Sequence, residues 1–190
     1  FLKSFYYYVH MFISKNKYFL IIESIKDIDL KNIKKRNKFS IIYRNKNNLE
    51  NISKLLKFRR FCRMKSIKFY VANDIRLAVL LSSDGIYISA FNKSLKPRYL
   101  KNSNFKLIGS AHNLSEIRCK ERQNINFIFI SPLFSSQKNK KCLGIYKFLK
   151  LKKESKKKIV CLGGINSKNL KMLKFLKCDG LAGISLFREL

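Results

Sequence analysis

The chain has 190 residues, of which 46% are hydrophobic, enough to bury the core of one α/β domain. Its 42 basic and 11 acidic residues give a formal charge of +31. This charge indicates an anionic partner, although a genome biased toward lysine codons would produce the same excess. Five scattered cysteines without a C-x-x-C pair argue against a disulfide framework or a structural zinc site, and two histidines exclude a His-rich metal site. We therefore expect a reducing, cytoplasmic compartment.

Short, continuous apolar runs recur along the chain, as expected of parallel strands that are covered on both sides. They predict eight strands, at residues 17–23, 38–44, 67–73, 85–89, 105–110, 125–131, 158–163 and 180–185. Helical patterns follow most of them, at residues 47–62, 73–81, 112–121, 143–153 and 166–176. Alternating strands and helices predict a parallel sheet. Eight strands favour a closed (β/α)₈ TIM barrel over the alternative, an open doubly wound sheet.

No linker divides the sequence, so residues 1–190 are interpreted as one domain. The chain stops soon after the eighth predicted strand, and we expect the last helix to be truncated. The amphipathic segment 2–12, or a second subunit of a homo-oligomer, would then cover the open seam. No apolar run approaches the roughly 20 residues of a membrane span, and no cleavage site of a signal peptide is present. The missing initiator methionine suggests a fragment or a processed product.

Two predicted strands end in glycine-rich segments. In TIM barrels the active site lies at the carboxyl ends of the strands, and phosphate often binds the loops after strands seven and eight. Gly163 and Gly164 end the seventh predicted strand, and Ile184 and Ser185 end the eighth. Their backbone N–H groups, beside the start of a helix, would form an anion site. The alternative is a glycine turn that only lets the strand bend into the helix.

The other strand ends are polar as well, and cationic, amide and hydroxyl groups on one rim suit a polyphosphate substrate. The residues concerned are Arg44, Lys46, Asn73, Asp74, Ser89, Asn92, Ser110, His112, Ser131, Ser136 and Lys138. Each also has a purely structural alternative. Asn73 and Asp74 would cap a helix, as would Asn166 or Ser167 after the glycine pair. His112 is interpreted as an orienting or capping group rather than a base.

Six segments follow one another along the chain and read IIYRNK, VANDIRLAVLLSSDGIYIS, LIGSAHNLSEI, FIFISPLF, LGGINSKNL and DGLAGISLF. In this order they resemble the family of thiamine-phosphate synthases and thiazole tautomerases, and the resemblance runs from about residue 18 to 187. The resemblance implies a (β/α)₈ transferase of thiamine biosynthesis. Such an enzyme joins hydroxymethylpyrimidine diphosphate to thiazole phosphate and releases pyrophosphate, with Mg²⁺ as cofactor. It would work by gripping pyrophosphate and shielding a pyrimidine-methylene cation.

The resemblance also assigns roles to individual residues. It implies that Arg44, Lys46 and Asn73 hold the pyrophosphate and that Asp74 ligates the metal. Ser110 would contact the pyrimidine. Gly164 would bind the thiazole phosphate through its backbone, beside Gly163, with Ile184 and Ser185 helping.

Some positions depart from the family pattern. Ile42 stands where the family has a glutamine, and the second metal-binding carboxylate is replaced by Asn92. Ser136 and Lys138 are the candidates for a threonine and a lysine of the loop after the sixth strand. One carboxylate instead of two would weaken a Mg²⁺ site.

Three alternatives to a synthase remain open at the level of the sequence. One is a tautomerase-like enzyme that handles only the thiazole phosphate, with His112 as its base. The second is a catalytically degenerate family member. The third is a non-catalytic barrel that binds a polyanion. Because the aromatic residues fall within the predicted strands, we do not expect nucleic acid as the partner.

Overall fold

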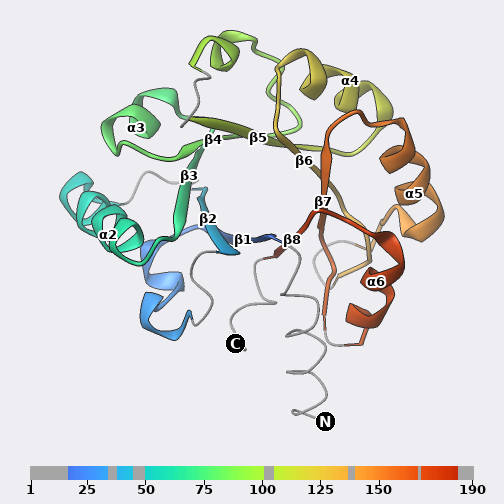
Figure 1. Cartoon of the computed structure of the whole chain (residues 1–190), viewed down its shortest axis with the longest axis horizontal. Coiled ribbons are helices and arrows are strands. Elements are labelled where there is room, and N and C mark those ends of the chain that lie inside the picture. The colour runs from blue at the N-terminus through green and yellow to red at the C-terminus, as the bar shows by residue number, and fades with distance from the viewer. Residues whose placement is uncertain are drawn as a thin grey trace.

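A computed structural model of the chain describes residues 17–33, 38–44, 50–100, 105–136, 140–166 and 168–183. Eight parallel strands close into a barrel in chain order, and helices surround it (Figure 1), which confirms the predicted (β/α)₈ fold. The strands are β1 (Lys17–Ile22), β2 (Phe39–Tyr43), β3 (Lys68–Ala72), β4 (Gly85–Ile88), β5 (Lys106–Ala111), β6 (Phe127–Ile130), β7 (Lys158–Leu162) and β8 (Gly180–Gly183).

The segments between the strands hold α-helices and short 3₁₀ turns. The helices are α2 (Ile52–Met64), α3 (Ile75–Leu80), α4 (Leu114–Arg122), α5 (Gly144–Glu154) and α6 (Leu173–Leu176). The 3₁₀ turns are η1 (Ile25–Asp27), η2 (Leu30–Asn32), η4 (Lys96–Leu100) and η5 (Leu170–Met172). The predicted truncation of the last helix and the covering segment 2–12 lie outside the described residues.

The apolar residues form two shells, because side chains alternate between the two faces of each strand. One shell fills the barrel axis with aromatic and branched side chains, and Phe19 and Phe129 meet there edge to face with 4.8 Å between ring centroids. The other shell lies between the strands and the helices. A filled axis leaves the chemistry to the two ends of the barrel.

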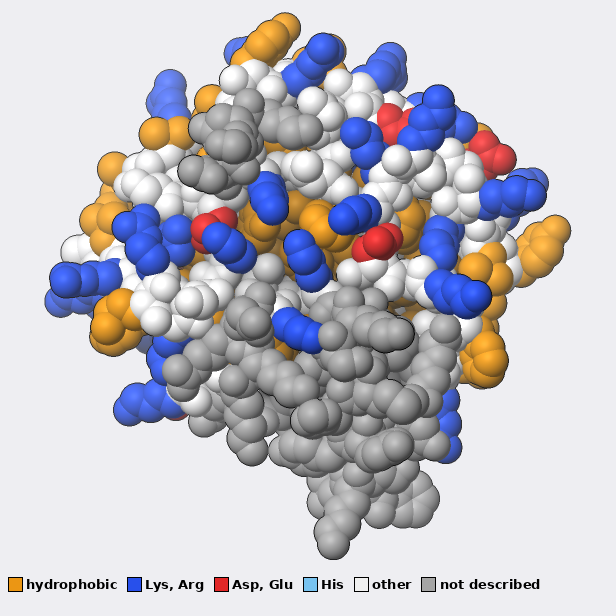
Figure 2. Space-filling view, in the orientation of Figure 1, with side chains coloured by type: hydrophobic (Ala, Val, Ile, Leu, Met, Phe, Trp, Pro, Cys, Tyr) orange, Lys and Arg blue, Asp and Glu red, His pale blue; other side chains and the backbone are white. Residues whose placement is uncertain are grey.

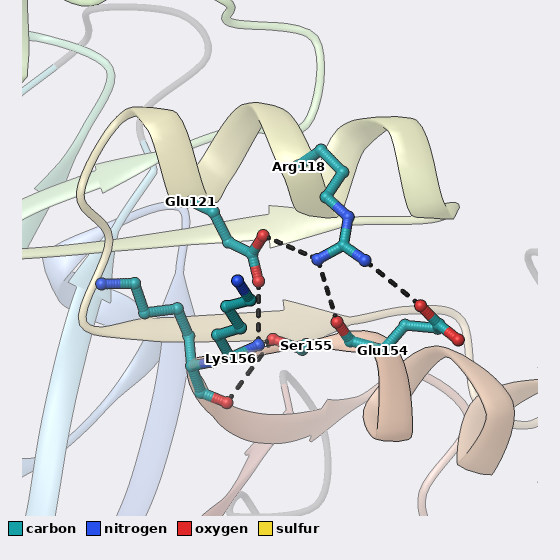
Figure 3. Close-up of polar contacts among 6 residues, drawn as sticks. Arg118, Glu121, Glu154, Ser155 and Lys156 are labelled. Atoms are coloured by element: carbon teal, nitrogen blue, oxygen red, sulfur yellow. Dashed lines mark hydrogen bonds and ion pairs between the residues drawn. The ribbon is translucent and has the colours of Figure 1, made fainter.

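A polar clamp joins two neighbouring helices of the outer layer (Figure 3). The guanidinium of Arg118 in α4 contacts Glu121 of the same helix at 3.0 Å and the Glu154 carboxylate at the end of α5 at 3.2 Å. It also donates to the Glu154 carbonyl oxygen, and Glu121 accepts the N–H of Lys156 at 2.8 Å. The clamp therefore links α4 to the segment that leads into β7.

The predicted helix at 166–176 is largely wrong, since α6 covers only its last four residues. The cause is local side-chain chemistry. The Asn166 side-chain oxygen accepts the N–H groups of Lys168 and Asn169 and stabilises a turn that competes with a helix. The prediction that Asn166 caps the helix is therefore wrong, because α6 begins after Met172 without a side-chain cap, and Ser167 lies outside the described residues.

The helix α4 starts at an N-cap, Asn113, that lacks the second hydrogen bond of a capping box. The Asn113 side chain accepts the Glu116 N–H at 2.9 Å and so caps the helix. However, the Glu116 carboxylate accepts the backbone N–H of His112 and not that of Asn113.

Among the helices in the described part of the chain, none is long and apolar enough to cross a bilayer.

Candidate active site at the carboxyl ends of the strands

The predicted cation Arg44 follows β2 directly. Its backbone N–H donates to the Ile22 carbonyl oxygen, and its guanidinium contacts Glu23 at 3.2 Å. Its Nε atom is buried and finds no hydrogen-bond acceptor among the described residues. A buried donor without an acceptor is costly, so an anionic ligand at this position would be stabilised.

Ser110 and Tyr87 lie in the barrel close to Arg44. Burial raises the pKa of Tyr87, while a hydrogen bond with Ser110 and the charge of Arg44 oppose that rise. Both side chains are almost fully buried. Tyr87 was not predicted as a site residue, because in an apolar strand it reads as core. The hydroxyl groups of Tyr87 and Ser110, close to the Arg44 guanidinium, thus place polar groups inside this end of the barrel.

Asn73, after β3, fastens its strand to the end of β4. Its backbone adopts a left-handed conformation with φ of 59°. Its side chain donates to the Ser89 hydroxyl at 2.5 Å and accepts the Ser89 N–H at 3.0 Å. The Asn92 side chain donates to the same Asn73 oxygen at 3.3 Å. The structure therefore brings three of the predicted polar residues together.

The predicted metal ligands offer few oxygens for a cation. Asp74 is the N-cap of α3, since its Oδ1 accepts the Leu77 N–H at 2.9 Å. The Asn92 side-chain oxygen accepts the Ser94 N–H. Among the described residues, no group of three or more His, Cys, Asp or Glu side chains is placed to hold a metal. Asp74 alone has a carboxylate oxygen to offer, which fits a Mg²⁺ held mainly by water and substrate phosphates.

The glycine pair after β7 has left-handed backbone, with φ of 94° at Gly163 and 68° at Gly164. A Cβ atom on Gly164 would meet the Phe134 carbonyl oxygen at 2.2 Å. The Gly163 carbonyl oxygen in turn accepts the Phe134 N–H at 3.1 Å. The glycines are thus required by the loop after β6, a contact between distant segments that the sequence did not indicate.

The Gly164 N–H remains suited to an anion. In the described part of the chain no hydrogen bond has this N–H as its donor. The Gly164 carbonyl oxygen, by contrast, accepts from the Asn169 side chain at 2.8 Å. The turn is therefore fixed from its carbonyl side, which leaves the amide for a ligand.

His112 contacts the backbone at the end of the neighbouring strand. Its Nδ1 lies 2.7 Å from the Ser131 carbonyl oxygen. A carbonyl oxygen can only accept, so Nδ1 carries the proton. The ring thereby joins the end of β5 to the end of β6.

The remaining predicted site residues divide into two groups. Ser136 is exposed on the loop after β6. Four others lie outside the described residues: Lys46, Lys138, Ile184 and Ser185.

Sequence reasoning missed the buried support of the loop after β4. Lys120 in α4 is fully buried, and its ammonium group donates to the carbonyl oxygens of Ser89 and Asn92 at 2.8 and 2.9 Å. Gln123 donates to the carbonyl oxygens of Asn92 and Ser94. One signal was available, since Lys120 lies three residues after the buried Ile117 and so on the apolar face of its helix.

These features define a TIM-barrel protein whose carboxyl-end rim holds a glycine turn, linked polar side chains and a guanidinium nitrogen without an acceptor among the described residues. The family model for thiamine monophosphate synthase matches residues 20–187, and the chain belongs to this family.

Curated relatives agree with the family. The chain is 25% identical over 145 residues to the thiamine-phosphate synthase of Clostridioides difficile (strain 630), a match that covers 75% of this chain and 69% of that protein. It is 30% identical over 137 residues to that of Lactococcus lactis subsp. cremoris (strain MG1363), covering 70% and 63%. The match to the thiamine-phosphate synthase of Prochlorococcus marinus (strain AS9601) is 28% identical and covers 74% of this chain but 40% of that longer protein.

Solved structures share the fold at low identity. A thiamine phosphate pyrophosphorylase from Pyrococcus furiosus superposes with a TM-score of 0.68 at 18% identity, covering 92% of this chain and 88% of that one. The YdjI aldolase of Escherichia coli K12 superposes with a TM-score of 0.67 at 7% identity, covering 94% and 80%. Since proteins of different names superpose equally well, this likeness shows the barrel alone.

Proposed function

We propose that the chain is a thiamine-phosphate synthase, which condenses hydroxymethylpyrimidine diphosphate with thiazole phosphate. The carbon–oxygen bond to the diphosphate breaks, and its electron pair leaves with the pyrophosphate. The lone pair of the thiazole nitrogen then forms the new carbon–nitrogen bond. The observation that carries this proposal is the buried Arg44 Nε, which finds no acceptor among the described residues. Arg44 stands at the strand end to which the resemblance to the family assigns a pyrophosphate ligand.

The described residues support a division of labour on the rim. Arg44 would stabilise the departing pyrophosphate as charge develops on it, with Lys46 beside it in the sequence. The Gly164 N–H would hold the thiazole phosphate, and Ser110 and Tyr87 would contact the pyrimidine. Mg²⁺ would supply charge neutralisation through Asp74, with substrate oxygens and water completing its coordination.

The experiment is a steady-state assay with both substrates and Mg²⁺, following thiamine phosphate formation. Arg44→Gln should lower kcat by about 10²-fold, as expected for one lost transition-state donor. Arg122→Gln, at an exposed position at the end of α4, removes the same charge and should leave kcat within about twofold of the unaltered chain.

Three outcomes would contradict parts of the proposal. No product from micromolar unaltered chain would overturn the synthase activity, and turnover of thiazole phosphate alone would favour the tautomerase alternative. Full activity of Arg44→Gln would overturn the role of that residue while leaving the activity standing.

A further inference from the structure

The other end of the barrel carries a ring of lysines. Each odd-numbered strand begins with one, namely Lys17, Lys68, Lys106 and Lys158. Two residues further along, each strand contributes a side chain to the shell inside the barrel: Phe19, Tyr70, Ile108 and Val160. Because side chains two apart in a strand share a face, all four lysines start from the inward face. They form one layer of four residues from alternate strands.

Three observations show that the ammonium groups converge. Lys17 and Lys158 place their Nζ atoms 4.8 and 5.8 Å from the centroid of the Phe127 ring. Partial burial lowers the pKa of Lys17, and the charges of Lys106, Lys158 and Lys68 lower it further. In Figure 2 basic side chains surround an area of hydrophobic side chains at the centre of the face. The strands of Figure 1 follow one another clockwise in the same view, which for right-handed crossovers is the view onto their amino ends.

The positive charge of the ring is only partly balanced. Asp84 contacts Lys68 at 3.1 Å, but it also contacts the buried Arg59 at the same distance. Asp179, which precedes β8, accepts the backbone N–H of Ile159. Among the described residues no carboxylate forms an ion pair with Lys17, Lys106 or Lys158. Like charges gathered in this way destabilise the fold unless an anion joins them.

We propose that this lysine ring binds the phosphate groups of a compact oligophosphate anion, at the end of the barrel opposite the candidate active site. Each ammonium group has three N–H donors, and the four groups surround the barrel axis. Together they can bind the many oxygens of several phosphate groups, whereas a single carboxylate has only two oxygens to offer them. Lys17 and Lys158 lie against the Phe127 ring, which is therefore not a platform for a stacked base as single-stranded nucleic acid would require. The inference does not depend on the synthase activity.

The test is isothermal titration calorimetry with inorganic triphosphate at 150 mM KCl. The ring variant is Lys17→Gln/Lys106→Gln/Lys158→Gln. Its matched control is Lys147→Gln/Lys150→Gln/Lys153→Gln, three exposed residues of α5 that carry the same charge change. The ring variant should bind triphosphate at least about tenfold more weakly than the control. It should melt at the same or a higher temperature, because a repulsion is removed.

Further arms separate this site from the active site and identify the source of the phosphate. Arg44→Gln should retain the ring-dependent binding whether or not the synthase proposal holds. ATP binding as tightly as triphosphate, with AMP much weaker, would indicate that a nucleotide can supply the phosphates. Triphosphate binding without ATP binding would restrict the site to inorganic anions. Equal affinity of the ring variant and the control, or binding that Arg44→Gln abolishes, would overturn the proposal.

Discussion

Lys120 connects the buried interior to the candidate active site. Its ammonium donates to two carbonyl oxygens of the loop after β4 and to the Gln123 side chain at 2.9 Å. That loop carries Ser89 and Asn92, which contact Asn73. The lysine therefore fixes the backbone on which the polar rim is built, without contacting a substrate itself.

Replacing Lys120 by Met should lower the free energy of unfolding by roughly 1–3 kcal/mol, because two buried carbonyl oxygens lose their donor. Urea unfolding measures the change, and Lys150→Met on an exposed position of α5 is the control.

The same comparison should depend on pH. Burial lowers the pKa of Lys120 to about 8, below its value in an unfolded chain. The unfolded state thus binds more protons, and the unaltered chain should gain stability relative to the variant between about pH 8 and 10. No loss in the variant, or a gap that narrows with pH, would contradict this account.

Gly164→Ala should both destabilise the chain and impair activity. The added methyl group would meet the Phe134 carbonyl oxygen, and φ of 68° is unfavourable for alanine. Gly144→Ala is a matched control, since Gly144 has φ of 70° but no atom within 4 Å of the added Cβ. The difference between the two melting temperatures isolates the close approach. Equal losses would show that only backbone conformation matters at Gly164.

Among the elements, α4 is fixed at both of its ends. Asn113 and Glu116 hold its start, while Arg118 and Glu121 join it to the segment after α5 (Figure 3). Burial opposes ionisation of Glu121, but the Lys156 N–H and the Arg118 guanidinium outweigh it and hold the pKa of Glu121 below its usual value. The ionised carboxylate therefore contributes to the stability of this pair of helices.

Acidification should remove that contribution. A carboxyl group with a lowered pKa in the folded state stabilises the fold above its unfolded pKa, near 4.3, and loses this effect as the pH falls through the folded pKa. Glu121→Gln should therefore be less stable than the unaltered chain at pH 7 and approach it below about pH 4. Chemical unfolding at both pH values measures the gap. Glu154→Gln, on the more exposed side of the clamp, should show a smaller gap.

At the scale of the whole molecule, the sequence predicted the barrel because it contains eight continuous apolar runs with helical patterns in most of the gaps between them. The sequence did not predict contacts between distant segments, nor the burial of a side chain of a type that is usually exposed. The packing of Gly164 on Phe134 cannot be deduced from local spacing, and Lys120 reads as a surface residue unless its helical position is considered. The short α6 has a local cause, the competing turn at Asn166. The sequence thus predicted which residues lie at the strand ends, but it did not predict which other residues they contact.

The high net charge should make the stability of the chain depend on salt. Of the described charges, few are paired, and like charges repel most strongly at low ionic strength. Raising KCl from 20 to 300 mM should raise the melting temperature by a few degrees. The lysine-ring variant should show a smaller rise than the α5 control with the same charge. A melting temperature that falls with salt would contradict this view.

The contact between the loops after β6 and β7 has a consequence for evolution and engineering. Leu162 and Gly163 accept backbone hydrogen bonds from Leu133 and Phe134, and Gly164 has no room for a side chain beside the same loop. The two loops therefore constrain each other's sequence and should change together in evolution, although about thirty residues of sequence separate them. A chimera that exchanges one loop with a relative must exchange residues 131–136 and 162–166 together, and natural changes in one loop should be accompanied by changes in the other.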